Sequence, residues 1–97
     1  MKHRILVLEL DIRLFDAQSL KDKRKVKRRL VDKLKAAYNL SIAETEHLDK
    51  WQRIGLTVAY VAVDQGTAKD MADTLRGVVD GLLEGEGELL GADIDIL

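Results

Sequence analysis

A run of cations between residues 21 and 35 is the feature of this sequence best suited to binding a charged partner. The run holds nine lysines and arginines against two acids, a local charge of +7 in a chain whose formal net charge is −1. The remaining residues therefore carry −8. Such a separation of charge favours a face that meets phosphate, an acidic protein or the acidic part of the same chain. The cations are Lys21, Lys23, Arg24, Lys25, Lys27, Arg28, Arg29, Lys33 and Lys35.

The spacing of this run predicts a helix that displays most of its cations on one side. Ser19 and Asp22 resemble a capping box, and apolar residues then recur at helical spacing, which predicts a helix of about 18 residues ending near Asn39. At about 100° per residue, Lys23 and Lys27 flank the apolar stripe, and the other side carries an arc of cations. We call this arc the basic strip: Lys21, Arg24, Lys25, Arg28, Arg29 and Lys35.

Three explanations of the basic strip stay open. The strip could bind RNA phosphates or other anions, it could bind an acidic protein, or it could be a solvated surface whose aliphatic stems cover the core. Like charges four residues apart on a helix repel by roughly 0.2–0.5 kcal/mol per pair, so the arrangement has a cost that bound anions would relieve. We expect phosphate binding.

A second cluster could hold a metal ion or do acid–base chemistry: Glu44, Glu46, His47 and Asp49. We expect Glu44 and Glu46 to share one side of a strand and His47 to begin a turn, where oxygen and imidazole ligands could meet a divalent ion. The spacing matches no standard site. We therefore expect a polar hairpin end with no metal, no cofactor and no catalytic residue, and a small metal-dependent enzyme is the least favoured alternative.

The segment Trp51-Gln52-Arg53 offers a further contact for nucleic acid. Trp51 could stack on a base while Arg53 binds a phosphate, or Trp51 could cover the edge of the core at a hairpin, and the second arrangement is favoured. RNA-recognition modules stack bases on aromatic residues of their central strands. Here the first strand has none and the third has only Tyr60, so RNA contact should use phosphates more than bases.

Six elements position these residues. Alternating or apolar runs predict four strands, at 5–14, 40–46, 54–63 and 89–97. A turn is expected at 47–50, and Asp64 can cap a second helix that Gly85 and Gly87 end. The order β-α-β-β-α-β is the split βαβ, or ferredoxin-like, arrangement. It is an α+β sandwich in which two helices cover one face of a four-stranded antiparallel sheet.

The other face of such a sheet is left open. If Leu6 to Leu14 face the helices, Ile5 and Val7 lie on the open face, and the third strand adds either the row containing Leu56 or the row containing Thr57, Ala59, Val61 and Val63. An apolar patch there usually marks a partner, so we expect a homodimer or larger homo-oligomer. The alternative function is thus an interaction module. It would self-associate through the open face, or through the basic strip and the acidic stretch Asp80, Glu84, Glu86 and Glu88 of a neighbour.

Composition sets the remaining limits. Ninety-seven residues with 46% apolar content predict a single domain, 1–97, with one packed core. The longest apolar run is too short for a membrane span of about 20 residues, and the first residues lack the pattern of a signal peptide. The absence of cysteine excludes disulfides and thiolate catalysis. We expect a cytoplasmic protein with no membrane contact.

Two strings in the sequence resemble a known family. They are Ala17-Gln18-Ser19-Leu20-Lys21-Asp22-Lys23-Arg24 and, after Ala43-Glu44, Trp51-Gln52-Arg53. The chain resembles the YlxP-like bacterial family, small proteins classed as a domain of unknown function. The resemblance implies a ferredoxin-like fold. It also implies an RNA- or ribosome-related role, because genes of the family commonly lie among those for translation factors and ribosome maturation. No enzymatic activity is carried over from the resemblance, because none is established for the family.

These inferences predict a non-enzymatic accessory protein that binds RNA or a ribosomal particle. The predicted phosphate contacts are the six residues of the basic strip, and Trp51 and Arg53 form a secondary contact.

Overall fold

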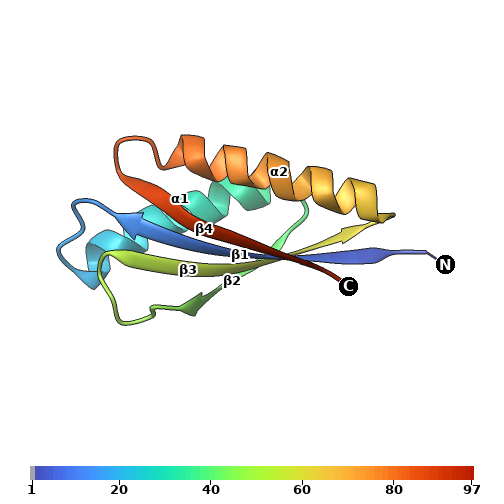
Figure 1. Ribbon diagram of the computed structural model, residues 1–97. Coiled ribbons are helices and arrows are strands. Elements are labelled where there is room, and N and C mark those ends of the chain that lie inside the picture. The colour runs from blue at the N-terminus through green and yellow to red at the C-terminus, as the bar shows by residue number, and fades with distance from the viewer. Residues whose placement is uncertain (1) are drawn as a thin grey trace.

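The computed structural model describes residues 2–97, which form two layers, a four-stranded sheet and a pair of helices on one face of it (Figure 1). The order of elements is the predicted β-α-β-β-α-β. The elements are β1 (Arg4–Leu14), α1 (Leu20–Ala37), β2 (Ser41–Glu46), β3 (Arg53–Ala62), α2 (Gln65–Leu82) and β4 (Gly87–Ile96). The molecule is elongated, with extents of 47 × 23 × 22 Å.

All neighbouring strands in the sheet are antiparallel, in the order β2-β3-β1-β4. Each helix connects two strands that are not neighbours in the sheet, so β1 lies between β3 and β4. This is the ferredoxin-like topology that the sequence predicts. It leaves β2 and β4 as the two edges.

The core lies between the sheet and the helices, and β1 supplies its centre. The even-numbered residues of β1 from Leu6 to Leu14 are at most 2% exposed. On β3 the buried row is Ile54, Leu56 and Val58, which places Thr57, Ala59, Val61 and Val63 on the open face. The helices contribute one stripe each, which consists of Leu30 and Leu34 from α1 and Ala68, Ala72, Leu75 and Val79 from α2.

The open face divides into an apolar half and an acidic half. Near the chain ends Ile5 pairs with Val61, and Val61, Val63 and Leu97 are 69%, 71% and 61% exposed. Toward the other end lies a hollow of about 340 Å³. Its ionisable lining residues are Glu9, Asp11, Glu46, His47 and Asp93. The predicted apolar patch is therefore present, but it occupies only half of the face.

Both helices begin at a side-chain cap. The Oγ of Ser19 accepts from the Asp22 N–H at 3.1 Å, and the Asp22 carboxylate accepts from the Gln18 N–H, so a capping box is present one residue further upstream than its simplest form. Asp64 accepts from the Thr67 N–H at 2.7 Å, and this hydrogen bond holds the pKa of Asp64 below its ordinary value. The cap residues thus fix where α1 and α2 begin.

Neither helix between Lys2 and Leu97 has the length and hydropathy required to cross a membrane.

Candidate nucleic-acid interface

The nine cations of the 21–35 run separate into a group that forms ion pairs within the chain and a group that does not. Lys23, Lys27 and Arg29 form ion pairs with Glu44 or Glu86. The other six are exposed on α1 and form no ion pair with any carboxylate in residues 2–97. They are Lys21, Arg24, Lys25, Arg28, Lys33 and Lys35.

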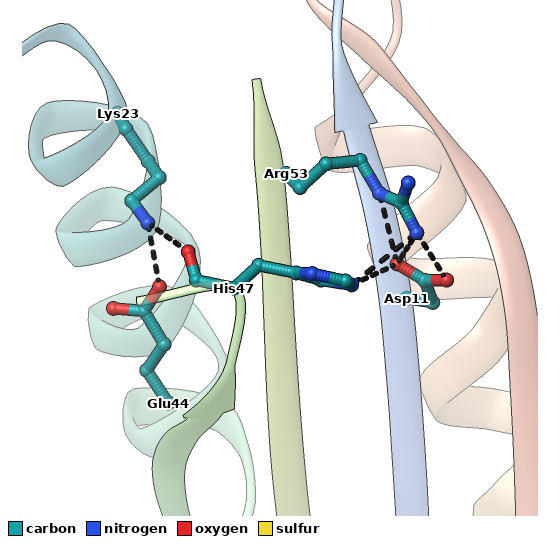
Figure 2. Close-up of polar contacts among 5 residues, drawn as sticks. All are labelled: Asp11, Lys23, Glu44, His47 and Arg53. Carbon is teal, nitrogen blue, oxygen red and sulfur yellow. Dashed lines mark hydrogen bonds and ion pairs between the residues drawn. The ribbon is translucent and has the colours of Figure 1, made fainter. Parts of the chain in front are cut away.

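Lys23 is the one buried charged residue among those that the structure describes, at 1% exposure. Its ammonium donates to Glu44 Oε2 at 2.9 Å, to the His47 carbonyl at 2.8 Å and to the Leu48 carbonyl at 3.2 Å. Figure 2 shows the side chain reaching from α1 to the start of the turn between β2 and β3. Three acceptors satisfy the three N–H donors of the ammonium, so Lys23 ties this turn to the first turns of α1.

Arg29 belongs to the predicted basic strip, but the structure gives it a partner within the chain. Its Nη1 donates to Glu86 Oε1 at 3.1 Å, and its Nη2 donates to Glu86 Oε2. Glu86 belongs to the acidic stretch that was considered as a contact for the basic strip of a neighbouring copy. Here it pairs with Arg29 of its own chain. The members of the strip that form no ion pair in residues 2–97 are thus Lys21, Arg24, Lys25, Arg28 and Lys35.

A groove of mixed charge runs along one side of this strip, between α1 and the edge strand β2. The helix lines it with Arg24, Lys27, Arg28, Val31 and Asp32, and β2 lines it with Ile42, Ala43 and Glu44. Its volume is about 350 Å³. A chain of phosphates on the outer face of α1 would thus find cations on the helix surface, whereas Asp32 and Glu44 place negative charge in the adjoining groove.

Trp51 is 53% exposed, in the turn that Lys23 fastens to α1. The favoured expectation that Trp51 covers the edge of the core is therefore wrong. Gln52 next to it makes the inward contacts instead: its carbonyl accepts from the Leu14 N–H at 2.8 Å, and its side-chain Nε2 donates to the Ala17 carbonyl at 3.1 Å. The tryptophan side chain remains available to a partner, close to the start of α1.

Arg53 lies on the open face of the sheet, away from α1, so the structure does not bring it together with the basic strip. Its Nη2 donates to both carboxylate oxygens of Asp11, at 2.9 and 2.7 Å, and lies 3.2 Å from His47 Nε2 (Figure 2). Asp11 neutralises the guanidinium, and the adjoining hollow is acidic. Both features disfavour a phosphate contact there, so Arg53 no longer belongs to the candidate interface.

The candidate metal cluster is divided by a β-bulge. The register between β2 and β3 shifts between Glu44 and Glu46, so Glu44 points toward Lys23 and Lys27 while Glu46 lines the hollow on the open face. The expectation that the two acids share one side of the strand is wrong. The side chains of residues 2–97 contain no group of three or more acids or histidines able to hold a metal ion.

Gly55 makes the bulge feasible. The side chain of Glu46 passes over Gly55 so closely that a Cβ at position 55 would collide with the Glu46 Cβ. A glycine inside a strand often marks a bulge or a close approach of another segment, so Gly55 could have indicated the bulge from the sequence. The position of Lys23 beside the apolar stripe, seven residues before Leu30, indicated its burial, but its partner Glu44 could be assigned only from the fold.

A comparison with known families shows which family the chain belongs to. Residues 5–91 match the model of the family DUF503, described as a protein of unknown function. The chain belongs to the DUF503 family. It is 30% identical over 76 residues to the uncharacterized protein YlxP of Bacillus subtilis (strain 168), an alignment that covers 78% of this chain and 83% of that protein.

Two solved structures are similar in fold to this DUF503 member. A candidate chlorite dismutase, TA0507, matches 99% of the chain with a TM-score of 0.57 and 19% identity, and the chain spans 43% of that protein. A de novo designed protein with a ferredoxin fold, LFR1 1, matches the whole chain and 84% of its own, with a TM-score of 0.50 and 18% identity. At these identities the likeness concerns the fold alone.

Proposed function

We propose that this protein binds RNA in the cytoplasm, as a non-enzymatic accessory of RNA or ribosomal particles, through phosphate contacts on the outer face of α1. One observation carries the proposal: five cations of the basic strip are exposed on one helix without an acidic partner in residues 2–97. Three other cations of the same helix form ion pairs, Lys23 and Lys27 with Glu44 and Arg29 with Glu86.

The chain is not short of acids with which to neutralise the strip, because it contains 17 aspartates and glutamates in total. Glu44 and Glu86 engage the cations nearest the sheet and the α2–β4 turn, and the outer cations are left to solvent. The pairs Lys21/Lys25 and Arg24/Arg28 still repel at a spacing of four residues. A surface that retains this repulsion is suited to an anionic partner with regularly spaced charges, as in an RNA backbone.

Phosphate contacts predict a steep dependence of the RNA affinity on salt. Each neutralised phosphate releases condensed counterions, with a slope of about −0.7 to −0.9 in log K against log salt per contact. Contacts from Lys21, Arg24, Lys25, Arg28 and Lys35 therefore imply a slope of roughly −3.5 to −4.5. Fluorescence anisotropy with a labelled structured RNA at several salt concentrations measures it.

Charge-neutral variants locate the binding surface in the same assay. Changing Arg24, Lys25 and Arg28 together to Gln should flatten the slope by about two to three units. Lys69→Gln is the matched control, because Lys69 is an exposed cation on α2 and its loss should leave the slope unchanged. No RNA binding at about 50 mM salt, or an affinity that does not depend on salt, contradicts the proposal.

A second candidate function, self-association through the open face, is favoured by the apolar half of that face. Val61, Val63 and Leu97 are each more than 60% exposed, beside Ile5. Sedimentation equilibrium at tens of micromolar, with Val61→Glu as the disrupting variant, tests it. A dimer that Val61→Glu dissociates supports this function, and a monomer at all concentrations rejects it.

A further inference from the structure

The four aromatic residues of the chain divide by exposure. Tyr38 and Tyr60 are partly buried against the hydrophobic core, whereas Phe15 and Trp51 are 41% and 53% exposed. Phe15 lies in the β1–α1 loop and Trp51 in the β2–β3 turn, and these connections meet the α2–β4 turn at one end of the molecule (Figure 1). We call this the loop end. It lies opposite the apolar half of the open face.

Backbone hydrogen bonds hold the two aromatic residues on adjoining segments. Arg13 and Arg53 are opposite each other in the β1–β3 register, and the Leu14 N–H donates to the Gln52 carbonyl at 2.8 Å directly beyond them. Phe15 and Trp51 are the next residues along each segment. The Phe15 N–H donates in turn to the Glu86 carbonyl at 2.9 Å, so the main chain is held at Phe15 itself and at Gln52, next to Trp51.

The ring of Phe15 is also fixed by a side chain. The guanidinium carbon of Arg13 lies 5.0 Å from the ring centroid, and Arg13 Nε donates to Glu88 Oε1 at 2.9 Å. The cation covers one face of the ring while 41% of the residue stays exposed. A ring held in this way loses little freedom when a flat partner stacks on its uncovered side.

The loop end is continuous with the start of the basic strip. Lys23 binds the carbonyls of His47 and Leu48, which fastens the Trp51 turn to α1 within one helical turn of Lys21 and Lys25. A polyanion that lies along α1 would therefore reach the exposed aromatic residues as it passes the end of the helix. Flat bases and a phosphate chain are the two chemical features that such a surface fits.

We infer that the loop end binds unpaired nucleotides, with bases stacked on Trp51 and Phe15 while the adjoining phosphates contact the basic strip. This inference rests on the proposed function and specifies its substrate class. Bases within a duplex are covered on both faces by their neighbours, so an aromatic side chain can stack only on bases in single strands, loops or ends. The preferred RNA is therefore single-stranded or looped.

An anionic membrane surface is the competing partner for exposed aromatic residues beside cations. The loop end also carries Asp16 next to Phe15, and Asp49 between Leu48 and Trp51, both exposed. Insertion of Phe15 and Trp51 into a bilayer would bring these carboxylates to anionic headgroups, which repel them. RNA phosphates would meet the same repulsion, but a nucleotide can place its uncharged base at the loop end and keep its phosphate on the basic strip.

Trp51 is the sole tryptophan of the chain, so its fluorescence reports directly on the loop end. The protein is titrated with one RNA sequence in three forms: single-stranded, in the loop of a hairpin, and within a blunt duplex. Quenching of Trp51 by the first two forms, with affinities at least about tenfold above that of the duplex, is the expected result.

Variants complete the test, and anisotropy with labelled RNA measures their affinity. Trp51→Ala and Phe15→Ala should each lower the affinity for single-stranded RNA by roughly tenfold and leave the salt slope unchanged. Trp51→Phe should retain most of the wild-type affinity. Val61→Ala, at the far end of the molecule, is the matched control. Thermal melting confirms that each variant is folded.

The possible failures are distinguishable. Equal affinity for the three RNA forms with no effect of Trp51→Ala overturns the stacking inference and leaves phosphate binding in place. No RNA binding at low salt overturns both proposals. A blue shift of Trp51 fluorescence with vesicles of phosphatidylglycerol and phosphatidylcholine, without quenching by RNA, overturns the inference in favour of a lipid surface.

Discussion

At the scale of single residues, Lys23 shows how one cation of a basic run can serve the fold rather than a partner. The position lies on the buried side of α1, where an unpaired ammonium would be strongly destabilising. Glu44 of β2 and two carbonyls of the β2–β3 turn supply its partners. The residue therefore adds no charge to the outer surface, and it holds the Trp51 turn in place.

Removing the counterion of Lys23 should be costly. Glu44→Ala leaves a buried ammonium without its carboxylate, and the loss of one partner of a buried ion pair costs about 3–5 kcal/mol. Urea denaturation measures the free energy of unfolding. Glu88→Ala is the control, because the Arg13–Glu88 pair is about half exposed and should contribute less than about 1 kcal/mol. Equal losses in the two variants would show that the burial of Lys23 has no energetic consequence.

The cap of α2 gives a pH-dependent prediction. The hydrogen bond from the Thr67 N–H lowers the pKa of Asp64, so the carboxylate stabilises the fold above the pKa of an unfolded aspartate. This contribution is lost as the pH falls through the lowered pKa of the folded state. The difference in melting temperature between the wild type and Asp64→Ala should thus be present at neutral pH and shrink in acid. A difference that stays constant through the acid range would contradict this assignment.

At the scale of elements, the periodicity of the sequence was sufficient to predict the two helices and four strands. It was not sufficient to predict the side-chain contacts between them. The alternation from Leu6 to Leu14 and the helical spacing up to Leu34 each report burial, which is a local property of the sequence. The partners of Arg53 and Glu44 depend on register across the sheet. A bulge of one residue sends Glu46 to the opposite face from Glu44, and no period reveals that in advance.

Gly55 tests the bulge directly. Gly55→Ala places a Cβ against the Cβ of Glu46, and the strain should destabilise the fold by about 1–3 kcal/mol. Gly77→Ala is the matched control, because a Cβ at this position of α2 meets open space and alanine favours a helix. Thermal melting of both variants measures the effects. A neutral Gly55→Ala would mean that β2 accommodates the side chain by shifting its register.

At the scale of the whole molecule, positive and negative charge gather on different surfaces. The outer face of α1 is cationic, while the acidic hollow lies on the open face of the sheet. A near-neutral net charge conceals this separation. We therefore predict that an RNA approaches the outer face of α1 and the loop end rather than the acidic hollow.

The most direct test of phosphate binding compares two neighbouring arginines of α1. Arg28 is exposed without an acidic partner in the described part of the chain, whereas Arg29 pairs with Glu86. The RNA affinity of Arg28→Gln and Arg29→Gln is measured across a range of salt concentrations. We predict that Arg28→Gln flattens the slope of log K against log salt by about 0.7–0.9 and that Arg29→Gln leaves it unchanged. Equal slopes for the wild type and Arg28→Gln would contradict the account.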